Sequence, residues 1–287
     1  MTAKKTCLQY KYPTLVPPFP FSFVYSTFLP SSLPFLSSNI HSHLSLVYKQ
    51  NKTKAMHVHT LALSALFSLL AMISILPGSN VVEAHVGLLR PCARSSPRAG
   101  CPKPSAGQIT DYDLNSPIGT HDSMTSPICK NTVPSKTRTV YKAGQSIKTE
   151  YSIGAPHGGG HCQWAISYDA GKTWVVLKTL IRDCLKGTSS GSSYSVPVPL
   201  PKNAPNGNAV FMWLWNNAQG NRELYSNCAD IEIQGGSNGG SISGLVPLIA
   251  NYGAASLLIP EFPLPSSPDM HEAFGKRKAI TVKVAGN

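Results

Sequence analysis

The region from residue 85 to residue 234 lacks any run of Lys or Arg, although the whole chain of 287 residues has 25 basic and 13 acidic residues and a formal net charge of +12. Its basic residues are scattered, and no aromatic residues alternate with them. Nucleic-acid-binding proteins gather such charge on one face or along one segment. The sequence therefore predicts no nucleic-acid partner, and its charge is compatible with a neutral or acidic extracellular polymer.

The sequence also lacks an apolar run long enough to span a bilayer easily. The run at 61–76 has about 16 residues, whereas a transmembrane helix needs about 20. It follows Met56, is broken by Pro77 and Gly78, and is closed by a small residue at Ala84. This order is typical of a secretory signal peptide and favours that reading over a membrane helix. We expect a signal peptide at 56–84, a secreted, extracellular protein, and no stable membrane insertion after cleavage.

Residues 1–55 show no sustained period, and Pro and Ser interrupt each apolar segment. They are expected to be a disordered leader, or upstream sequence if Met56 is the true start. The mature chain then begins at His85.

Zinc-type Cys-x-x-Cys pairs are absent from the mature chain. It has an even set of cysteines: Cys92, Cys101, Cys129, Cys162, Cys184 and Cys228. An even number behind a signal peptide indicates an oxidising compartment and a disulfide framework. Six cysteines allow about fifteen pairings, and spacing alone does not choose among them.

Residues 85–234 contain no helix-period segment longer than about two turns. Short β-branched and aromatic runs alternate instead with Gly, Pro, Asn and Asp turns, at 146–153, 162–169, 173–181, 193–200, 208–218 and 228–234. In the run CQWAISYD, Trp164 and Ile166 share one face and Ala165 faces the other. This pattern predicts an all-β fold, an antiparallel β-sandwich of immunoglobulin or fibronectin type with long loops and disulfides. Residues 235–287 are expected to be a Gly/Ser linker and a Pro-rich, partly disordered tail.

His85 at a new N-terminus would carry both a free amine and an imidazole, which can chelate one metal ion. A second imidazole would complete a three-nitrogen, T-shaped set that suits copper. His157 is the best candidate, because the glycines after it have no strand propensity and leave its ring on an open loop. His161 competes with it, as a ligand, a hydrogen-bond donor beside the ligands, or a surface residue.

Glu223 and Tyr225 are two residues apart, so both point to one side of an extended segment. The phenol could lie axial to copper, and the carboxylate could hydrogen-bond or hand over a proton beside it. A buried Tyr with a salt-bridged Glu is the alternative, and the pair gains weight only together with the two histidines.

Two segments, HGGGHCQWAISYDAGKTW at 157–174 and FMWLWNNAQGNRELYSNCADIEI at 211–233, resemble the fungal copper-dependent lytic polysaccharide monooxygenases. The likeness is to the chitin-active auxiliary activity family eleven, or an early-diverging relative. It also covers LIANYG and IPEFP in the tail. The segment behind His85 departs from the usual family opening, which puts the substrate rather than copper binding in question.

The resemblance implies a copper brace of His85 and His157, with Tyr225 axial and Glu223 beside it. It implies core roles, or an electron path, for Trp213 and Trp215. Among the disulfides it implies Cys129–Cys228. Two neighbouring predicted strands suggest Cys162–Cys184, and Cys92–Cys101 is the pair that remains.

The family's activity is oxidative cleavage of glycosidic bonds in an insoluble polysaccharide, here chitin first and cellulose or another glucan second. We expect one copper ion per molecule, an external electron donor, O2 or H2O2 as co-substrate, and a monomer. The main alternative is a non-catalytic secreted protein that binds copper or chitin on the same fold. A wall protein without metal is a third possibility and requires that His85 not be the N-terminus.

Overall fold

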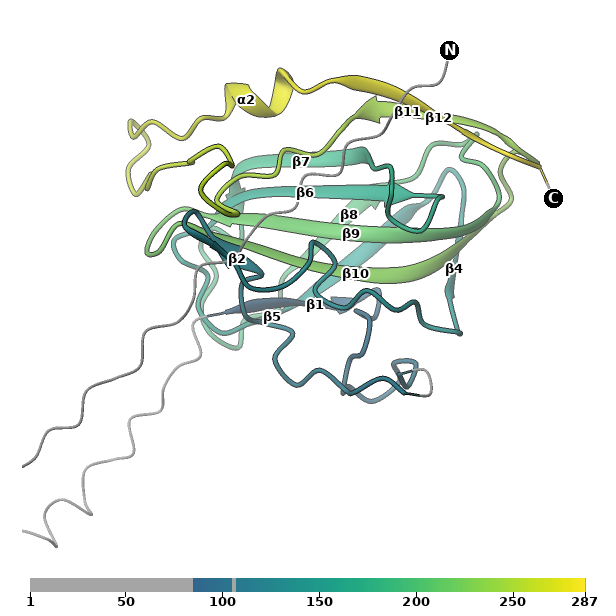
Figure 1. The fold of residues 1–287 in the computed structure, drawn as a ribbon, viewed down its shortest axis with the longest axis horizontal. Helices are drawn as coiled ribbons and strands as arrows, with labels where there is room; N and C mark the ends of the chain where they lie inside the picture. The colour runs from purple at the N-terminus through teal and green to yellow at the C-terminus, as the bar shows by residue number, and fades with distance from the viewer. Residues whose placement is uncertain (1–84, 105–106, 287) are drawn as a thin grey trace, which may run out of the picture. The chain divides into compact units, whose positions relative to one another are not determined.

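The computed structural model describes residues 85–104 and 107–286 (Figure 1). The expected leader and signal peptide, 1–55 and 56–84, lie outside the described residues. Within the described part, no helix is both long and apolar enough to cross a membrane.

Two β-sheets face each other. The smaller has the strand order β1-β5-β8 and the larger has the order β3-β2-β10-β9-β6-β7, with β4 beside β10. The smaller sheet consists of β1 (Val86–Arg90), β5 (Ser146–Ile153) and β8 (Ser195–Pro199). The larger consists of β2 (Gly119–Thr120), β3 (Ser123–Met124), β4 (Thr139–Lys142), β6 (Gly160–Ser167), β7 (Val175–Cys184), β9 (Gly207–Asn217) and β10 (Glu223–Gln234).

The core lies between these sheets and is built from large apolar side chains. Trp164, Trp213, Trp215 and Phe211 are fully buried in it, together with aliphatic residues of β1 and β5. Aromatic side chains bury the largest areas per residue, so these four dominate the packing. Trp213 and Trp215 are core residues, as the family likeness implied.

The register across the larger sheet determines which residues meet. β9 pairs antiparallel with both β6 and β10, and Trp215 of β9 lies opposite Cys162 on one side and Tyr225 on the other. These three residues therefore lie together near one end of the sheet, where β6 and β10 begin and β9 ends.

Three disulfides join Cys92 to Cys101, Cys129 to Cys228, and Cys162 to Cys184. They match the three expected pairs. The Cys129–Cys228 bridge ties the long loop before β4 to β10 and spans 99 residues of sequence. In the chain-entropy account, a closed loop of that size contributes roughly 4–5 kcal/mol to stability.

The predicted sandwich is confirmed. β5 has the predicted residues 146–153, and Trp164 and Ile166 face the core while Ala165 faces the other side of the sheet. The pattern did not predict β1 and β4, which are short. β10 begins at Glu223, earlier than predicted.

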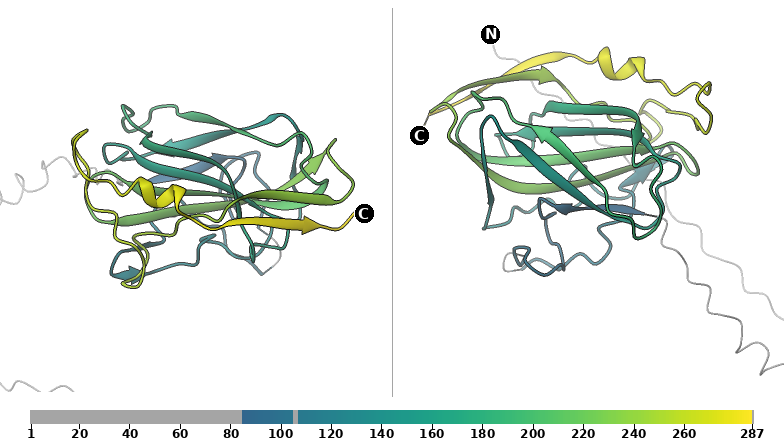
Figure 2. Two further views of the ribbon diagram at one scale, coloured as in Figure 1. Left: turned by 90° about the horizontal axis from the view of Figure 1, so that it is seen from above. Right: turned by 180° about the vertical axis from the view of Figure 1, so that it is seen from behind.

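The expectation of a flexible linker and a partly disordered tail at 235–287 is wrong. Residues 240–245 form β11 (Gly240–Leu245), which pairs antiparallel with β12 (Ala279–Val284), and a single helical turn, α2 (Glu272–Gly275), lies between them. Figure 2 shows this ribbon and the segment around α2 running along the larger sheet. The tail has its own buried cluster, Ala218, Leu248, Ala250, Ile259, Phe262 and Phe274.

The tail is held by polar side chains of β6 that face away from the core. Gln163 donates its Nε2 to the Leu248 carbonyl and accepts from the Leu248 N–H, both at 2.8 Å. His161 lies two residues away on the same face, stacked on Phe262. Gln163 and Leu248 are 85 positions apart, and His161 and Phe262 are about 100 positions apart. Contacts over such separations cannot be predicted from local composition.

We expect Phe274→Ala to lower the free energy of unfolding by about 3 kcal/mol, because it removes a buried aromatic ring between the tail and β6. Urea denaturation measures this difference. Ile109→Ala is the matched control, since Ile109 is 86% exposed. Equal stability of the two variants would contradict a docked tail.

Candidate copper site

His157 lies on a tight loop just before β6, and its backbone is left-handed at φ 47°. A residue other than Gly rarely adopts this conformation, which costs roughly 1–2 kcal/mol. Such strain persists where the surroundings hold it in place, and it clusters at functional sites. The local structure therefore holds the imidazole of His157 in one direction, with its side chain 18% exposed.

The glycines after His157 allow the loop to press against β9. A Cβ atom on Gly160 would lie 2.1 Å from the Asn216 carbonyl oxygen and 2.6 Å from Trp215 Nε1. No side chain fits there. The HGGG sequence is thus needed for close backbone approach, which agrees with the expectation that glycines present the His157 ring.

Three side chains meet in front of this loop. Tyr225 donates its hydroxyl to Glu223 Oε2 at 2.8 Å, and Tyr225 Oη lies 3.4 Å from His157 Nε2. Glu223 Oε2 is 3.9 Å from the same nitrogen. Glu223 and Tyr225 do share one side of β10, as their spacing predicts.

His85 lies beside the same phenol. Its ring centroid is 6.2 Å from that of Tyr225, and the His157 ring centroid is 6.4 Å from Tyr225. The His85 carbonyl accepts from the Gly154 N–H at 2.7 Å, which ties the start of β1 to the loop that carries His157. Two imidazoles far apart in sequence thus flank one phenol.

Tyr225 is held as a neutral phenol. Burial raises the pKa of its hydroxyl far above the ordinary value, and the Glu223 carboxylate raises it further through its charge and its hydrogen bond. A neutral oxygen is a weaker metal ligand than a phenolate. Tyr225 would therefore be a weak ligand to a copper ion held by the two histidines.

The donor set fits copper. In residues 85–104 and 107–286, no three His, Cys, Asp or Glu side chains gather as a conventional metal cluster. A brace needs only two imidazoles, a terminal amine and one oxygen, and nitrogen ligands of this kind suit copper. His85, His157 and Tyr225 supply all of these groups once the chain begins at His85.

His161 is not part of this arrangement, so its suggested place beside the ligands is wrong. Its ring is buried on the opposite face of β6, between Phe262 and Phe274. Nδ1 accepts from the Arg182 N–H at 3.1 Å and Nε2 lies 3.0 Å from the Asp269 carbonyl oxygen. Both ring nitrogens are occupied by the protein. Its position follows from strand alternation, because His161 and Ala165 point to one face of β6 and Trp164 points to the other.

The sequence reading missed the loop between β9 and β10. The Gln219 N–H donates to the His157 carbonyl at 2.9 Å, and a Cβ on Gly220 would lie 3.1 Å from His157 Nδ1. Arg222 donates to the Asn217 and Pro260 carbonyls. This loop packs against the imidazole and links it to the tail. The Gly-Asn-Arg-Glu motif at 220–223 was the available signal.

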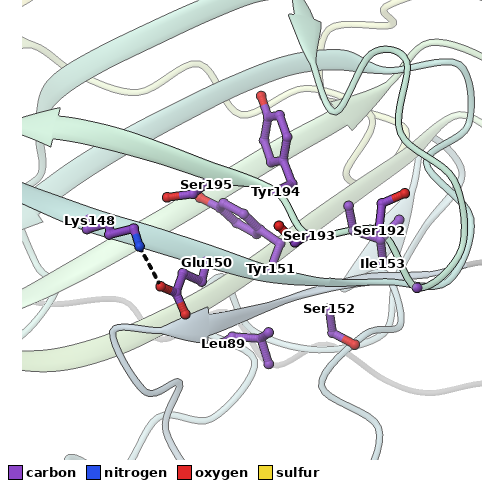
Figure 3. Close-up of a pocket in the computed structure, with 11 residues that line it drawn as sticks. Leu89, Lys148, Glu150, Tyr151, Ser152, Ile153, Ser192, Ser193, Tyr194 and Ser195 are labelled. Carbon is purple, nitrogen blue, oxygen red and sulfur yellow. Dashed lines mark ion pairs between the residues drawn. The ribbon is translucent and has the colours of Figure 1, made fainter.

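The predicted site residues do not line the pocket of about 470 Å³ shown in Figure 3. That pocket lies between β5 and the segment 191–195, and Lys148 and Glu150 form an ion pair at 3.1 Å beside it. The convergence of His85, His157 and Tyr225 belongs to the loop end of the sandwich, not to that pocket.

Residues 97–231 match the family model described as lytic polysaccharide mono-oxygenase, cellulose-degrading. These residues include His157, Glu223 and Tyr225. This segment is similar to the lytic polysaccharide monooxygenase family. The match does not include His85 or the docked tail.

The relatives that the chain matches are fungal proteins. The chain is 39% identical over 130 residues to the AA11 family lytic polysaccharide monooxygenase A of Aspergillus fumigatus, covering 44% of this chain and 56% of the relative. It is 28% identical over 187 residues to an AA11 family lytic polysaccharide monooxygenase of Aspergillus oryzae, covering 60% of this chain and 41% of the relative. The chain thus spans about half the length of these relatives.

Among solved structures, a cellulose-active polysaccharide monooxygenase from M. thermophila is similar with a TM-score of 0.38 and 13% identity. The alignment covers 57% of this chain and 86% of that structure. A score at this level adds nothing to the fold described above.

We expect stability to depend on the charge of His161. Burial lowers its pKa from 6.5 to about 4, while the Asp269 carbonyl and carboxylate partly oppose this and Arg182 and His271 add to it. Protonation would also place a second N–H against that of Arg182. The unfolded chain takes up the proton first, so stability is full above pH 6.5 and falls as the pH drops toward 4, by about 3 kcal/mol.

Urea denaturation from pH 7 to pH 4 measures this slope. His161→Gln removes most of it, whereas His121→Gln retains it because His161 and its partners stay in place. An unchanged slope in His161→Gln would show that other groups cause the acid sensitivity.

Proposed function

We propose that this chain is a secreted, copper-dependent lytic polysaccharide monooxygenase that oxidatively cleaves glycosidic bonds in an insoluble polysaccharide. The observation that supports this most is the convergence of His157, Glu223 and Tyr225, with the imidazoles of both His157 and His85 close to the Tyr225 ring. The family match and the three disulfides agree with it.

The N-terminal amine of His85 exists only after cleavage between Ala84 and His85. We place a secretory signal peptide at 56–84 on its sequence pattern, and the disulfides fit the oxidising compartment that secretion implies. The cut would free the amine at the start of β1, next to the loop that carries His157.

One copper ion, when bound by His85, His157 and Tyr225, supplies the redox chemistry that lets O2 or H2O2 and an external electron donor break a C–H bond beside the glycosidic link. The protein fixes the geometry around it. Tyr225 keeps its proton on Oη, and this O–H donates a hydrogen bond to Glu223 Oε2. Glu223 is 7% exposed, so its carboxylate can hold or transfer a proton at Oε2 with little competition from bulk water.

Chitin is the first substrate we propose, because the sequence motifs resemble those of the chitin-active group. Cellulose is second, in line with the description of the matching family model. A face built from loops, rather than a deep pocket, suits a flat insoluble polymer.

Copper binding provides the first test. We expect secreted protein to begin at His85 and to bind one Cu(II) with an axial spectrum in electron paramagnetic resonance. His157→Ala should weaken binding by more than about 100-fold, since losing even a supporting hydrogen bond costs about 10–100-fold. His271→Ala is the control and should bind like the parent. A different N-terminal residue would contradict the brace.

Product formation provides the second test. With β-chitin, ascorbate and peroxide, we expect oxidised chito-oligosaccharides by mass spectrometry. Glu223→Gln keeps the size of the side chain and removes its charge, and should lower the rate about 10²-fold or more while copper stays bound. Parallel reactions with cellulose decide the polymer. Binding to chitin without any oxidised product would instead indicate a non-catalytic copper- or chitin-binding protein.

A further inference from the structure

A groove of about 310 Å³ lies directly beside the loop that carries His157. One wall comes from the end of β7 and the residues after it, with Arg182, Asp183 and Lys186. The other comes from the tail, at Phe262–Pro265. Gly158, the neighbour of His157, lines the groove between them. The groove therefore borders the loop that carries His157.

The tail wall is fixed firmly in place. Phe262 donates its N–H to the Ala218 carbonyl at 3.0 Å. Arg182 donates to the carbonyls of Leu264 at 2.6 Å and Ser267 at 3.1 Å, and forms an ion pair with the buried Asp269 at 2.6 Å. Its guanidinium also lies 5.1 Å from the centre of the Phe262 ring. The backbone of the tail wall is thus preorganised.

The same wall is linked to the candidate ligand. The N–H groups of Ala218 and Gln219 donate to the carbonyls of Gly159 and His157, at 2.8 and 2.9 Å. Phe262 therefore reaches the His157 loop through one residue, Ala218. A molecule in the groove would lie in a fixed relation to the His157 side chain.

The two walls differ in chemistry. Leu264 is 62% exposed and stands next to two prolines, which form an apolar surface. Asp183 and Lys186 form an ion pair at 3.0 Å, and each side chain is 64% exposed. A pyranose ring has apolar C–H faces and a polar rim of hydroxyl or acetamido groups. Both kinds of surface are needed to hold such a ring, and a purely apolar or purely charged partner would leave one wall unused.

From these features we infer that the groove is a subsite for the β-1,4-linked pyranose chain of the substrate, and that the docked tail is one of its walls. Leu264 packs against a sugar ring, and Asp183 and Lys186 hydrogen-bond to its rim. This inference rests on the proposed function. It adds a substrate-binding element from outside residues 97–231, the part that matches the family model.

The test uses the full mature chain, copper-loaded and without reductant, in binding isotherms on β-chitin and on microcrystalline cellulose. Leu264→Asp places a charge on the apolar wall and should weaken binding about tenfold. The double variant Asp183→Asn with Lys186→Gln should weaken it severalfold. Val140→Asp is the matched control, because Val140 is 48% exposed on β4. It lies opposite Glu232, roughly 30 Å along β10 from Glu223.

Melting temperature and copper affinity are measured on the same preparations, so that a lost contact is told from a lost fold. Weaker binding by Leu264→Asp than by Val140→Asp, at equal melting temperature and copper affinity, supports the subsite. The polymer that shows the difference identifies the sugar. Parent-like binding by both groove variants overturns the subsite while leaving the proposed function intact. A parent chain that binds neither polymer overturns the proposed substrate and the subsite together.

Discussion

The close approach of Gly160 to β9 is the constraint on which the site and the tail both depend. A Cβ there would lie 2.1 Å from the Asn216 carbonyl oxygen, so only glycine allows β6 to begin at this point. The point at which β6 begins determines which face of the sheet each later side chain of β6 points to. Cys162 and Trp164 turn into the core, and His161 and Gln163 turn outward. The same contact turns the preceding residues into the strained loop that carries His157. One backbone contact therefore fixes the direction of the candidate ligand and the direction of the residues that hold the tail.

The site is assembled from two kinds of contact that differ in range. Glu223 and Tyr225 are neighbours on one strand, and their hydrogen bond needs only an extended backbone. His85 and His157 reach the phenol through tertiary structure: β1 pairs with β5, and the loop between β9 and β10 lies against the His157 ring. The residue before β1, at the edge of the smaller sheet, thus meets a loop at the end of the larger one. The disulfide from Cys162 to Cys184 holds the start of β6 to the end of β7, next to the same loop.

How much of this could be predicted from sequence depends on the range of each contact. Alternation in CQWAISYD predicted which face is buried, and the spacing of Glu223 and Tyr225 predicted that they meet, because both are local. The same alternation, extended back to His161, would have placed that ring on the face opposite Trp164. The Gly- and Pro-rich tail was predicted wrongly because its partners, Gln163 and Arg182 among them, lie far from it in the chain. Such distant partners cannot be predicted from the composition of the tail alone. The Leu248 contact with Gln163 becomes visible only when β6 and the tail are placed in three dimensions.

The hydrogen bonds of the Gly-rich segment after β10 have a consequence for how the chain resists proteolysis. Such sequences are usually cut first, since proteases need an extended stretch that can leave the surface. Here Gly236 donates to Asn206 Oδ1, the Ser237 N–H donates to the Ala204 carbonyl, and residues from Gly240 onward are paired with β12. The backbone that a protease would have to bind in an extended form is already hydrogen-bonded within the protein. A segment that resembles a flexible hinge in sequence is thus hydrogen-bonded along its backbone, and it keeps the wall at Phe262–Pro265 attached to the domain.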